Sequence, residues 1–184
     1  MNKNLMWVRW WVSPWENAHR DWRMQNRFVE TEALSRAYHQ RVSLLFEIEP
    51  ELPPRPSEPV FQLVLTCSPS QQDLALLLVR EIDNPSHDSR LNQAHHLWCQ
   101  RLTKAMTPEV LLPVNVDDPL HYLRAWVSPA IWQRLRLSFA RERVLELESH
   151  PRLLSTHGRL DTMWQAALWR ATSTPLNETQ HLPS

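Results

Sequence analysis

The chain has 184 residues, of which one is glycine, 15 are proline and 10 are tryptophan, and its 20 basic residues balance its 20 acidic ones. The single glycine, Gly158, leaves few places for hairpin turns or phosphate-binding loops, which argues against β-sandwiches, barrels and Gly-rich nucleotide-binding motifs. The neutral balance gives no broad positive field for nucleic acid, and two cysteines are too few for a disulfide framework.

The start of the chain carries a stripe of tryptophans. On one continuous helix Trp7, Trp11, Trp15 and Trp22 would fall within roughly 80° of arc, at about 100° per residue. The sequence Ser13-Pro14-Trp15-Glu16 has the form of a capping box that begins a new helix, which would divide the stripe between two short helices. Two interpretations stay open. The rings form a core, or part of the stripe is a docking surface, because Trp and Arg are enriched at interface hot spots.

The same segment bears on targeting. Its apolar run is broken by Arg9 and Pro14, so it is too short and too interrupted to predict a signal peptide. No stretch approaches the roughly 18 uncharged apolar residues that a membrane span needs. We therefore expect a soluble, cytoplasmic protein.

Helix starts recur along the chain as a capping residue followed by proline, at Ser68-Pro69-Ser70-Gln71, Thr107-Pro108, Asp118-Pro119 and Ser128-Pro129. Between these starts, apolar residues repeat with helical period. The predicted faces are Leu34, Tyr38, Val42, Leu45 and Ile48; Leu74, Leu77, Leu78 and Ile82; Leu91, His95, Trp98, Leu102 and Ala105; and Leu160, Trp164, Ala167, Leu168 and Ala171. We predict an all-α fold, an irregular multi-helix globular domain with a Trp-rich N-terminal helical segment.

A Pro-rich stretch divides the predicted domains. Residues 49–59 contain five prolines and are expected to form an extended, fairly stiff linker. It would separate an N-terminal helical segment, residues 1–48, from a main helical domain, residues 60–172. The polar residues 173–184 are expected to form a disordered tail.

Two short apolar stretches are ambiguous between strand and helix. Residues 60–65 alternate as a strand does, but a single strand has no partner in this sequence, so we predict a short buried helix. Residues 109–116 share the ambiguity.

The strongest candidate for chemistry is His95 with Cys99. These residues lie four apart and would share a helix face within reach of one metal ion. A zinc site needs two further ligands, which Cys67, His87 and His121 would supply only if the fold brought them there. A core thiol with histidines at a helix edge is the simpler interpretation. Neither cysteine has the neighbours that activate a nucleophile, so we expect no enzyme, no metal and no cofactor.

A basic stretch surrounds Trp132 and contains Arg134, Arg136, Arg141 and Arg143. Interleaved aromatic and basic residues can bind nucleic acid, but glutamates follow at once and weaken the field. Paired charges on an amphipathic helix, or an acidic protein partner, explain the pattern as well. The candidate partner-binding residues are therefore Trp7, Trp11, Trp15, Trp22, Trp132, Arg134, Arg136, Arg141 and Arg143.

Three blocks carry a family resemblance. They are Val-Leu-Thr-Cys-Ser-Pro-Ser-Gln-Gln at residues 64–72, Trp-Cys-Gln-Arg-Leu at 98–102, and Leu-Arg-Ala-Trp-Val at 123–127 continuing through 132–137 and 141–147. Together they resemble the SctK-class accessory proteins of bacterial type III secretion, especially the HrpD-like members of plant-associated bacteria. Such proteins are helical adaptors of the sorting platform, and the resemblance brings no catalytic residue or cofactor.

The resemblance implies a role in protein transport and virulence. The expected partners are the pod (C-ring) protein and the cytoplasmic domain of the inner-membrane ring protein. The expected location is the cytoplasm, peripheral to the inner membrane. The alternative function is a small metal- or nucleic-acid-binding regulator, which would use the His95/Cys99 pair and the arginine stretch.

Overall fold

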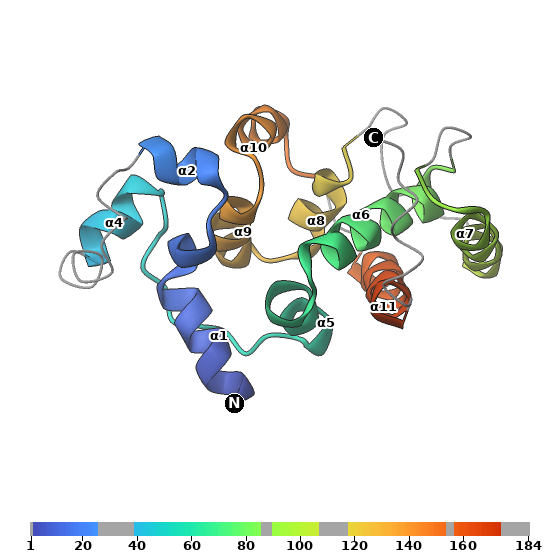
Figure 1. The fold of residues 1–184 in the computed structure, drawn as a ribbon, viewed down its shortest axis with the longest axis horizontal. Coiled ribbons are helices and arrows are strands. Elements are labelled where there is room, and N and C mark those ends of the chain that lie inside the picture. The colour runs from blue at the N-terminus through green and yellow to red at the C-terminus, as the bar shows by residue number, and fades with distance from the viewer. Residues whose placement is uncertain (1, 26–38, 86–89, 107–117, 154–156, 174–184) are drawn as a thin grey trace. The chain divides into compact units, whose positions relative to one another are not determined.

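A computed structural model describes residues 2–25, 39–85, 90–106, 118–153 and 157–173, and within these ranges the ordered elements are helices without any strand. The all-α prediction is confirmed. The elements (Figure 1) are α1 (Lys3–Val12), η1 (Pro14–Asn17), α2 (Arg20–Gln25), α4 (His39–Leu45), α5 (Glu58–Phe61), η3 (Gln62–Thr66), α6 (Pro69–Asp83), α7 (Gln93–Ala105), α8 (Leu120–Trp126), α9 (Pro129–Leu135), η4 (Arg136–Ser138), α10 (Arg141–Glu148) and α11 (His157–Ser173).

The chain divides into two compact units. Unit 1 comprises residues 1–56 and 127–151, and unit 2 comprises residues 57–126 and 152–184. This grouping differs from the predicted division at residues 49–59, because residues 127–151 group with the N-terminal segment. Whether the predicted boundaries at residues 48 and 60 mark separately folding domains stays a prediction.

Aromatic side chains fill unit 1. Trp7, Trp10 and Trp11 of α1 lie against one another, with ring centroids 4.9 to 6.3 Å apart. Trp15 of η1 stacks on Phe46, which follows α4, at 6.1 Å and 10° between the ring planes. The backbone N–H of His19 donates to the carbonyl of Leu137 at 2.7 Å, which joins the start of the chain to η4.

Unit 2 is built around α6, which packs against α7, α8 and α11. Of the predicted face of α6, Leu74, Leu78 and Ile82 are buried, whereas Leu77 is only partly covered. The whole predicted face of α11 is also buried: Leu160, Trp164, Ala167, Leu168 and Ala171. These two long helices therefore form the apolar centre of unit 2.

The predicted short helix at residues 60–65 is confirmed. α5 and η3 run over it continuously, and Val60, Phe61 and Leu63 are buried. The helix ends in a wide turn, in which Cys67 N–H donates five residues back to Gln62 C=O at 3.0 Å. Residues 109–116 and 174–184 lie outside the described residues.

Three of the predicted helix caps form, and in each the capping side chain accepts a hydrogen bond from a backbone N–H of the first helical turn. Ser68 Oγ accepts from Gln71 N–H at 3.3 Å, and Gln71 Oε1 accepts from Ser68 N–H at 2.9 Å, so this capping box is confirmed. Ser128 and Asp118 also cap, at 3.4 and 2.8 Å.

The predicted capping box at Ser13 is wrong. Ser13 makes no side-chain cap, and the carboxylate of Glu16 instead accepts from Arg9 at 3.2 Å. Pro14–Asn17 is wound as a tight 3₁₀ turn rather than as an α-helix. Thr107-Pro108 lies outside the described residues.

Two predicted helix faces need correction. On α7, His95 and Cys99 are buried, while Trp98 and Leu102 are only partly covered and Ala105 is exposed. On α4, Val42 is buried but Leu45 is exposed, and Leu34 and Tyr38 lie outside the described residues. Among the described helices, none combines the length and apolar composition that crossing a membrane requires.

The capping box of α6 gives a stability test. We expect Ser68→Ala to lower the free energy of unfolding by about 1 kcal/mol and the melting temperature by about 2–4 °C, because Gln71 N–H loses its acceptor. Ser57→Ala is the control, since Ser57 occupies the N-cap of α5 without a side-chain hydrogen bond. Thermal unfolding by circular dichroism measures both, and equal effects from the two variants would contradict the assignment.

Candidate functional site

Unit 1 brings together the tryptophans and arginines that the sequence singled out. The guanidinium of Arg134 in α9 lies 3.7 Å from the centre of the Trp11 ring. Arg136 in η4 and Arg141 in α10 lie 5.6 and 5.5 Å from the Trp22 ring. Two stretches more than 100 residues apart in the chain therefore form one aromatic–cation cluster.

This cluster is largely interior. Each of its buried members has an exposed fraction between 1% and 6%. These members are Trp7, Trp11, Trp15, Trp22, Trp132, Arg134 and Arg136. Arg141 and Arg143 are partly exposed. A partner cannot contact the buried side chains without displacing their neighbours, so the geometry favours the core interpretation of the tryptophan stripe.

The tryptophans of α1 hold the Pro-rich segment. The indole N–H of Trp7 donates to the carbonyl of Pro54, and that of Trp11 to the carbonyl of Glu51, both at 2.8 Å. An extended Pro-rich chain has no internal hydrogen bonds, so its carbonyls are available as acceptors. Through residue 56 the predicted linker is thus part of unit 1.

Arg134 is a buried cation held by backbone. Its guanidinium donates to the carbonyls of Trp11 (3.0 Å), Ala130 (2.9 Å) and Glu49 (3.2 Å). Burial lowers the pKa of Arg134 to about 10, and the nearby charge of Glu51 opposes the shift. The side chain thereby links α1, α9 and the Pro-rich segment, which gives it a structural role.

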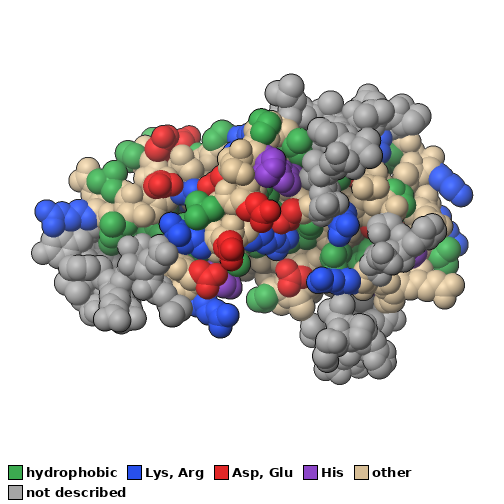
Figure 2. Space-filling model, turned by 90° about the horizontal axis from the view of Figure 1, so that it is seen from above, with side chains coloured by type: hydrophobic (Ala, Val, Ile, Leu, Met, Phe, Trp, Pro, Cys, Tyr) green, Lys and Arg blue, Asp and Glu red, His purple; other side chains and the backbone are tan. Residues whose placement is uncertain are grey.

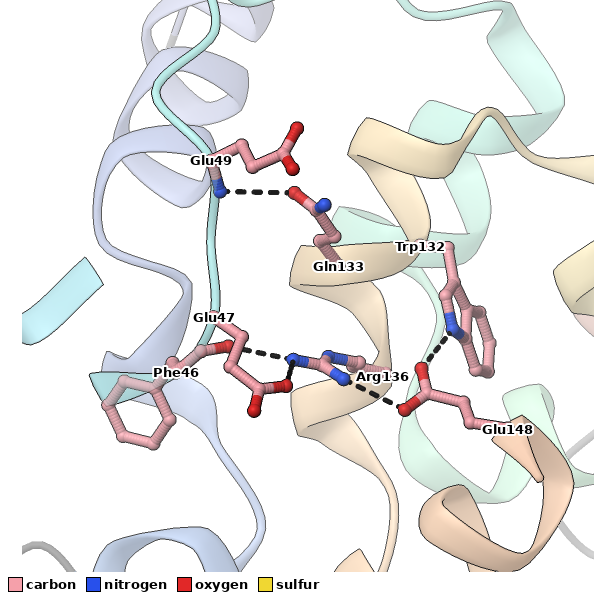
Figure 3. A network of polar contacts seen from close by, with 7 residues as sticks. All are labelled: Phe46, Glu47, Glu49, Trp132, Gln133, Arg136 and Glu148. Carbon is pink, nitrogen blue, oxygen red and sulfur yellow. Dashed lines mark hydrogen bonds and ion pairs between the residues drawn. The ribbon is translucent and has the colours of Figure 1, made fainter. Parts of the chain in front are cut away.

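Arg136 forms a second internal network, drawn in Figure 3. It donates to the Phe46 carbonyl at 2.8 Å and pairs with the carboxylates of Glu47 at 3.2 Å and Glu148 at 2.9 Å. Glu148 also accepts from the indole of Trp132 at 2.7 Å. The carboxylate thus receives two donors and balances the buried guanidinium.

Glu47 closes α4 in an unusual way. Its φ of 53° lies in the left-handed region, where a helix C-terminus usually has glycine. The paired bonds from Glu47 N–H to Leu44 C=O (3.0 Å) and from Ile48 N–H to Ser43 C=O (2.9 Å) define a Schellman motif. The contact of the Glu47 side chain with Arg136 accompanies this backbone conformation.

Beside the cluster, unit 1 has an apolar groove of about 460 Å³. Its wall includes Leu44 and Leu52, whose exposed fractions are 67% and 87%, and its lining reaches the buried Trp11 and Arg134. His39 Nε2–H donates to the Val12 carbonyl at 2.6 Å, which ties α4 to the end of α1 along the groove. We call this feature the unit 1 groove, lined by Trp11, Val12, His39, Gln40, Ser43, Leu44, Ile48, Glu49, Pro50, Glu51, Leu52 and Arg134.

The groove was not predicted from the sequence. Val12, Leu44 and Leu52 were absent from the candidate residues, although Leu52 gave a signal. It is a large apolar residue within a Pro-rich stretch that has no helix to bury it. Exposed apolar side chains on a concave surface are typical of sites that bind another molecule.

His95 and Cys99 lie on α7 in unit 2. Within the described residues, no three His, Cys, Asp or Glu side chains converge so that they could hold a metal ion. The Cys99 thiol faces the Leu78 carbonyl at 3.9 Å, and burial raises its pKa to about 12, as burial raises that of Cys67 to about 11. Both thiols are therefore protonated near neutral pH, a state that does not suit nucleophilic attack.

In the left and middle parts of the face drawn in Figure 2, acidic side chains lie beside basic ones. Arg134, Arg136 and Arg141 are engaged by carbonyls, carboxylates and the Trp22 ring. The arginine stretch is thus used within unit 1 rather than displayed as a continuous basic surface for nucleic acid.

Comparisons with protein-family models, with curated proteins and with solved structures each found no match to this chain.

The hydrogen bond from Trp11 gives a test of how the Pro-rich segment is held. We expect Trp11→Phe to lower the free energy of unfolding by about 1–3 kcal/mol, because the Glu51 carbonyl loses its donor. A Glu-specific protease should then cleave after Glu51 several times faster than in the parent chain. Trp10→Phe is the matched control, since among the described residues the buried Trp10 has no indole hydrogen bond. Equal cleavage rates in the two variants would refute the tie.

The burial of the Cys99 thiol predicts how the stability of the protein depends on pH. Its folded pKa of about 12 exceeds the ordinary value of 9.0, so the folded state holds the proton more tightly than the unfolded state. Stability should therefore be complete below pH 9 and fall as pH rises from 9 toward 12, by up to about 1.4 kcal/mol per pH unit from this group. In Cys99→Ala the fall measured by urea unfolding at pH 8, 9 and 10 should be shallower. An unchanged slope would contradict the burial of the thiol.

Proposed function

We propose that this protein is a non-catalytic adaptor that binds other proteins, and that it works in the cytoplasmic sorting platform of a bacterial type III secretion system. The observation that carries the binding role is the unit 1 groove, where exposed leucines border a concave surface. An apolar side chain of a partner that enters the groove would remove Leu44 and Leu52 from water.

The construction of the groove supports this role. Three pairs of its lining residues are joined by hydrogen bonds within unit 1. These pairs are Trp11 with Glu51, Arg134 with Glu49, and His39 with Val12. The lining is therefore organised before a partner arrives. A preorganised surface loses less conformational entropy on binding than a loop that must become ordered.

The absence of a catalytic role is part of the proposal. Several buried titratable groups of the described residues are paired or protonated, which supports it. Arg136 is paired with Glu148, Tyr122 donates to Asp83 at 2.9 Å, and Cys99 holds its proton. Such an arrangement suits a structural interior and offers no poised acid, base or nucleophile.

The secretion setting rests on the three sequence blocks that resemble SctK-class proteins. Residues 64–72 run from η3 into α6, residues 98–102 lie in α7, and the third block spans α8, α9 and α10. The expected partners are the pod protein and the cytoplasmic domain of the inner-membrane ring protein. The protein would link these two components without entering the membrane.

Purified components test this proposal. We expect the full chain to bind at least one of the two partners, measured by biolayer interferometry with the immobilised pod protein or ring domain. The double variant Leu44→Asp/Leu52→Asp should weaken that binding at least tenfold, because charge in the groove opposes apolar contact.

Leu145→Asp is the matched control, because Leu145 is an exposed leucine of α10 that does not line the groove. It should leave the affinity unchanged. Failure to bind either component, together with normal secretion after deletion of the gene, would reject the secretion adaptor. Binding that is unchanged in the double variant would show that the groove is not the binding surface.

A further inference from the structure

The exposed charges of the unit 1 groove are acidic. Its lining contains two glutamates, Glu49 and Glu51, which are exposed, and one arginine, Arg134, which is buried. Neither carboxylate forms an ion pair with a described residue, and in Figure 3 the contact drawn to Glu49 is from its backbone N–H. Arg134 donates to three backbone carbonyls, and the charge of Glu51 acts on it. The groove therefore presents a net negative charge to a partner.

This sign is opposite to the one that the arginine stretch suggested. An acidic protein partner was one interpretation of those arginines in the sequence. In the structure, however, Arg134 and Arg136 are buried and bonded within unit 1, so they are not displayed to a partner. An acidic segment that entered the groove would instead meet Glu49 and Glu51, which is repulsive.

The apolar surface of the groove continues along the outside of α1. Leu5, Val8 and Val12 have exposed fractions of 63%, 41% and 41%, and Val12 also lines the groove. At about 100° per residue these three side chains fall within roughly 60° of arc, and they extend over about 10 Å of the helix. The three tryptophans of α1 are buried on the other side. We call Leu5, Val8 and Val12 the α1 stripe; such spacing is what an amphipathic partner helix matches.

The cations of α1 do not reverse the sign of this surface. Arg9 borders the α1 stripe, and its guanidinium pairs with the carboxylate of Glu16 at 3.2 Å. Lys3 lies roughly 140° or more around the helix from each member of the stripe. The unpaired charge next to the stripe is therefore that of the groove glutamates, at the end where Val12 joins the two surfaces.

We propose that the unit 1 groove and the α1 stripe together dock a basic amphipathic helix of a protein partner. The leucines of this helix would cover the α1 stripe and enter the groove between Leu44 and Leu52. Lysines or arginines at the end that lies over the groove would pair with Glu49 and Glu51. The proposal rests on the proposed role of the groove as a protein-binding surface, and it does not depend on the secretion setting.

Charge also distinguishes this partner from two other occupants. In a symmetric contact, a second copy that used the same surface would bring Glu49 and Glu51 close to their own symmetry mates, which is repulsive. A membrane with anionic lipids attracts basic segments and repels carboxylates, so the acidic groove opposes binding to such a surface. A basic helix is the occupant that satisfies both the leucines and the glutamates.

Two synthetic peptides test the proposal against the full chain. Both are roughly 18-residue helices with leucine at positions i, i+3, i+4 and i+7; one has lysine at the flanking positions and the other has glutamate. We expect the lysine peptide to bind at least tenfold more tightly by fluorescence anisotropy at low ionic strength. Added salt should reduce this difference, because it screens exposed charges. In ¹⁵N-labelled protein the lysine peptide should shift backbone amide signals of the α1 stripe and of the groove lining.

Charge variants test the role of the glutamates. The reversal Glu49→Lys/Glu51→Lys should transfer the preference to the glutamate peptide. The neutral pair Glu49→Gln/Glu51→Gln should make the two affinities equal, and it serves where a lysine near the buried Arg134 destabilises the fold. Glu142→Lys/Glu146→Lys is the matched control, because these two exposed glutamates of α10 do not line the groove. It should keep the preference for the lysine peptide.

Apolar variants test the α1 stripe. Leu5→Ser/Val8→Ser should weaken the lysine peptide at least fivefold, because the apolar contact along α1 is lost while the glutamates remain. Leu145→Ser is the control, since Leu145 is an exposed leucine of α10 with an exposed fraction of 44%. It should leave the affinity unchanged. The melting temperature of each variant, measured by circular dichroism, checks that the fold is kept.

The outcomes separate this proposal from the secretion adaptor. Equal affinity for the two peptides, binding of neither, or amide shifts outside the stripe and the groove would overturn the basic helix, even where the pod protein or ring domain binds. A concentration-dependent dimer in sedimentation equilibrium that Leu5→Ser/Val8→Ser abolishes would assign the surface to a second copy instead. A preference for the lysine peptide that the glutamine pair abolishes would support the proposal, even where neither secretion component binds.

Discussion

The architecture of unit 1 depends on hydrogen bonds from buried side chains to backbone carbonyls of a Pro-rich segment. Trp7 and Trp11 donate to the carbonyls of Pro54 and Glu51, and Arg134 donates to that of Glu49 while lying on the Trp11 ring. Proline has no N–H, so the segment has few backbone donors of its own; Glu49 N–H donates to Gln133 Oε1 at 3.2 Å, and the side chains of Trp7, Trp11 and Arg134 hold its carbonyls. The path in turn places Leu52 beside the groove and keeps α1 next to α9.

In unit 2, too, buried side chains meet backbone carbonyls. There Thr103 and Cys99 face the carbonyls of α6, and His96 approaches Glu81. In both units polar side chains serve as interior contacts, and in unit 1 exposed leucines border the groove. Interior polar contacts require matched geometry, whereas the exposed leucines have no such requirement and are free to meet a partner. The groove of unit 1 therefore follows from how the interior polar groups of that unit are satisfied.

The sequence predicted several features that depend mainly on nearby residues, although the capping box at Ser13, which is equally local, was wrong. The capping box at Ser68, the short helix at residues 60–65 and the face of α11 depend on neighbours within a few residues, and all are confirmed. The cluster of Trp11 with Arg134 joins residues 123 apart, which no local pattern reports. The face of α7 was misassigned because hydrophobic period cannot show that His95, Cys99 and Thr103 have acceptors on α6. The groove was missed for a related reason, since the exposure of Leu52 depends on where its extended segment is anchored.

The Pro-rich segment also bears on aggregation. An extended chain at the surface normally presents a row of N–H and C=O groups to which another strand can add. In residues 49–56, which precede α5, the prolines at positions 50, 53, 54 and 56 remove N–H donors, and the carbonyls of Glu49, Glu51 and Pro54 already accept from Arg134, Trp11 and Trp7. The segment can thus remain extended beside an exposed leucine while it offers few backbone groups for strand addition.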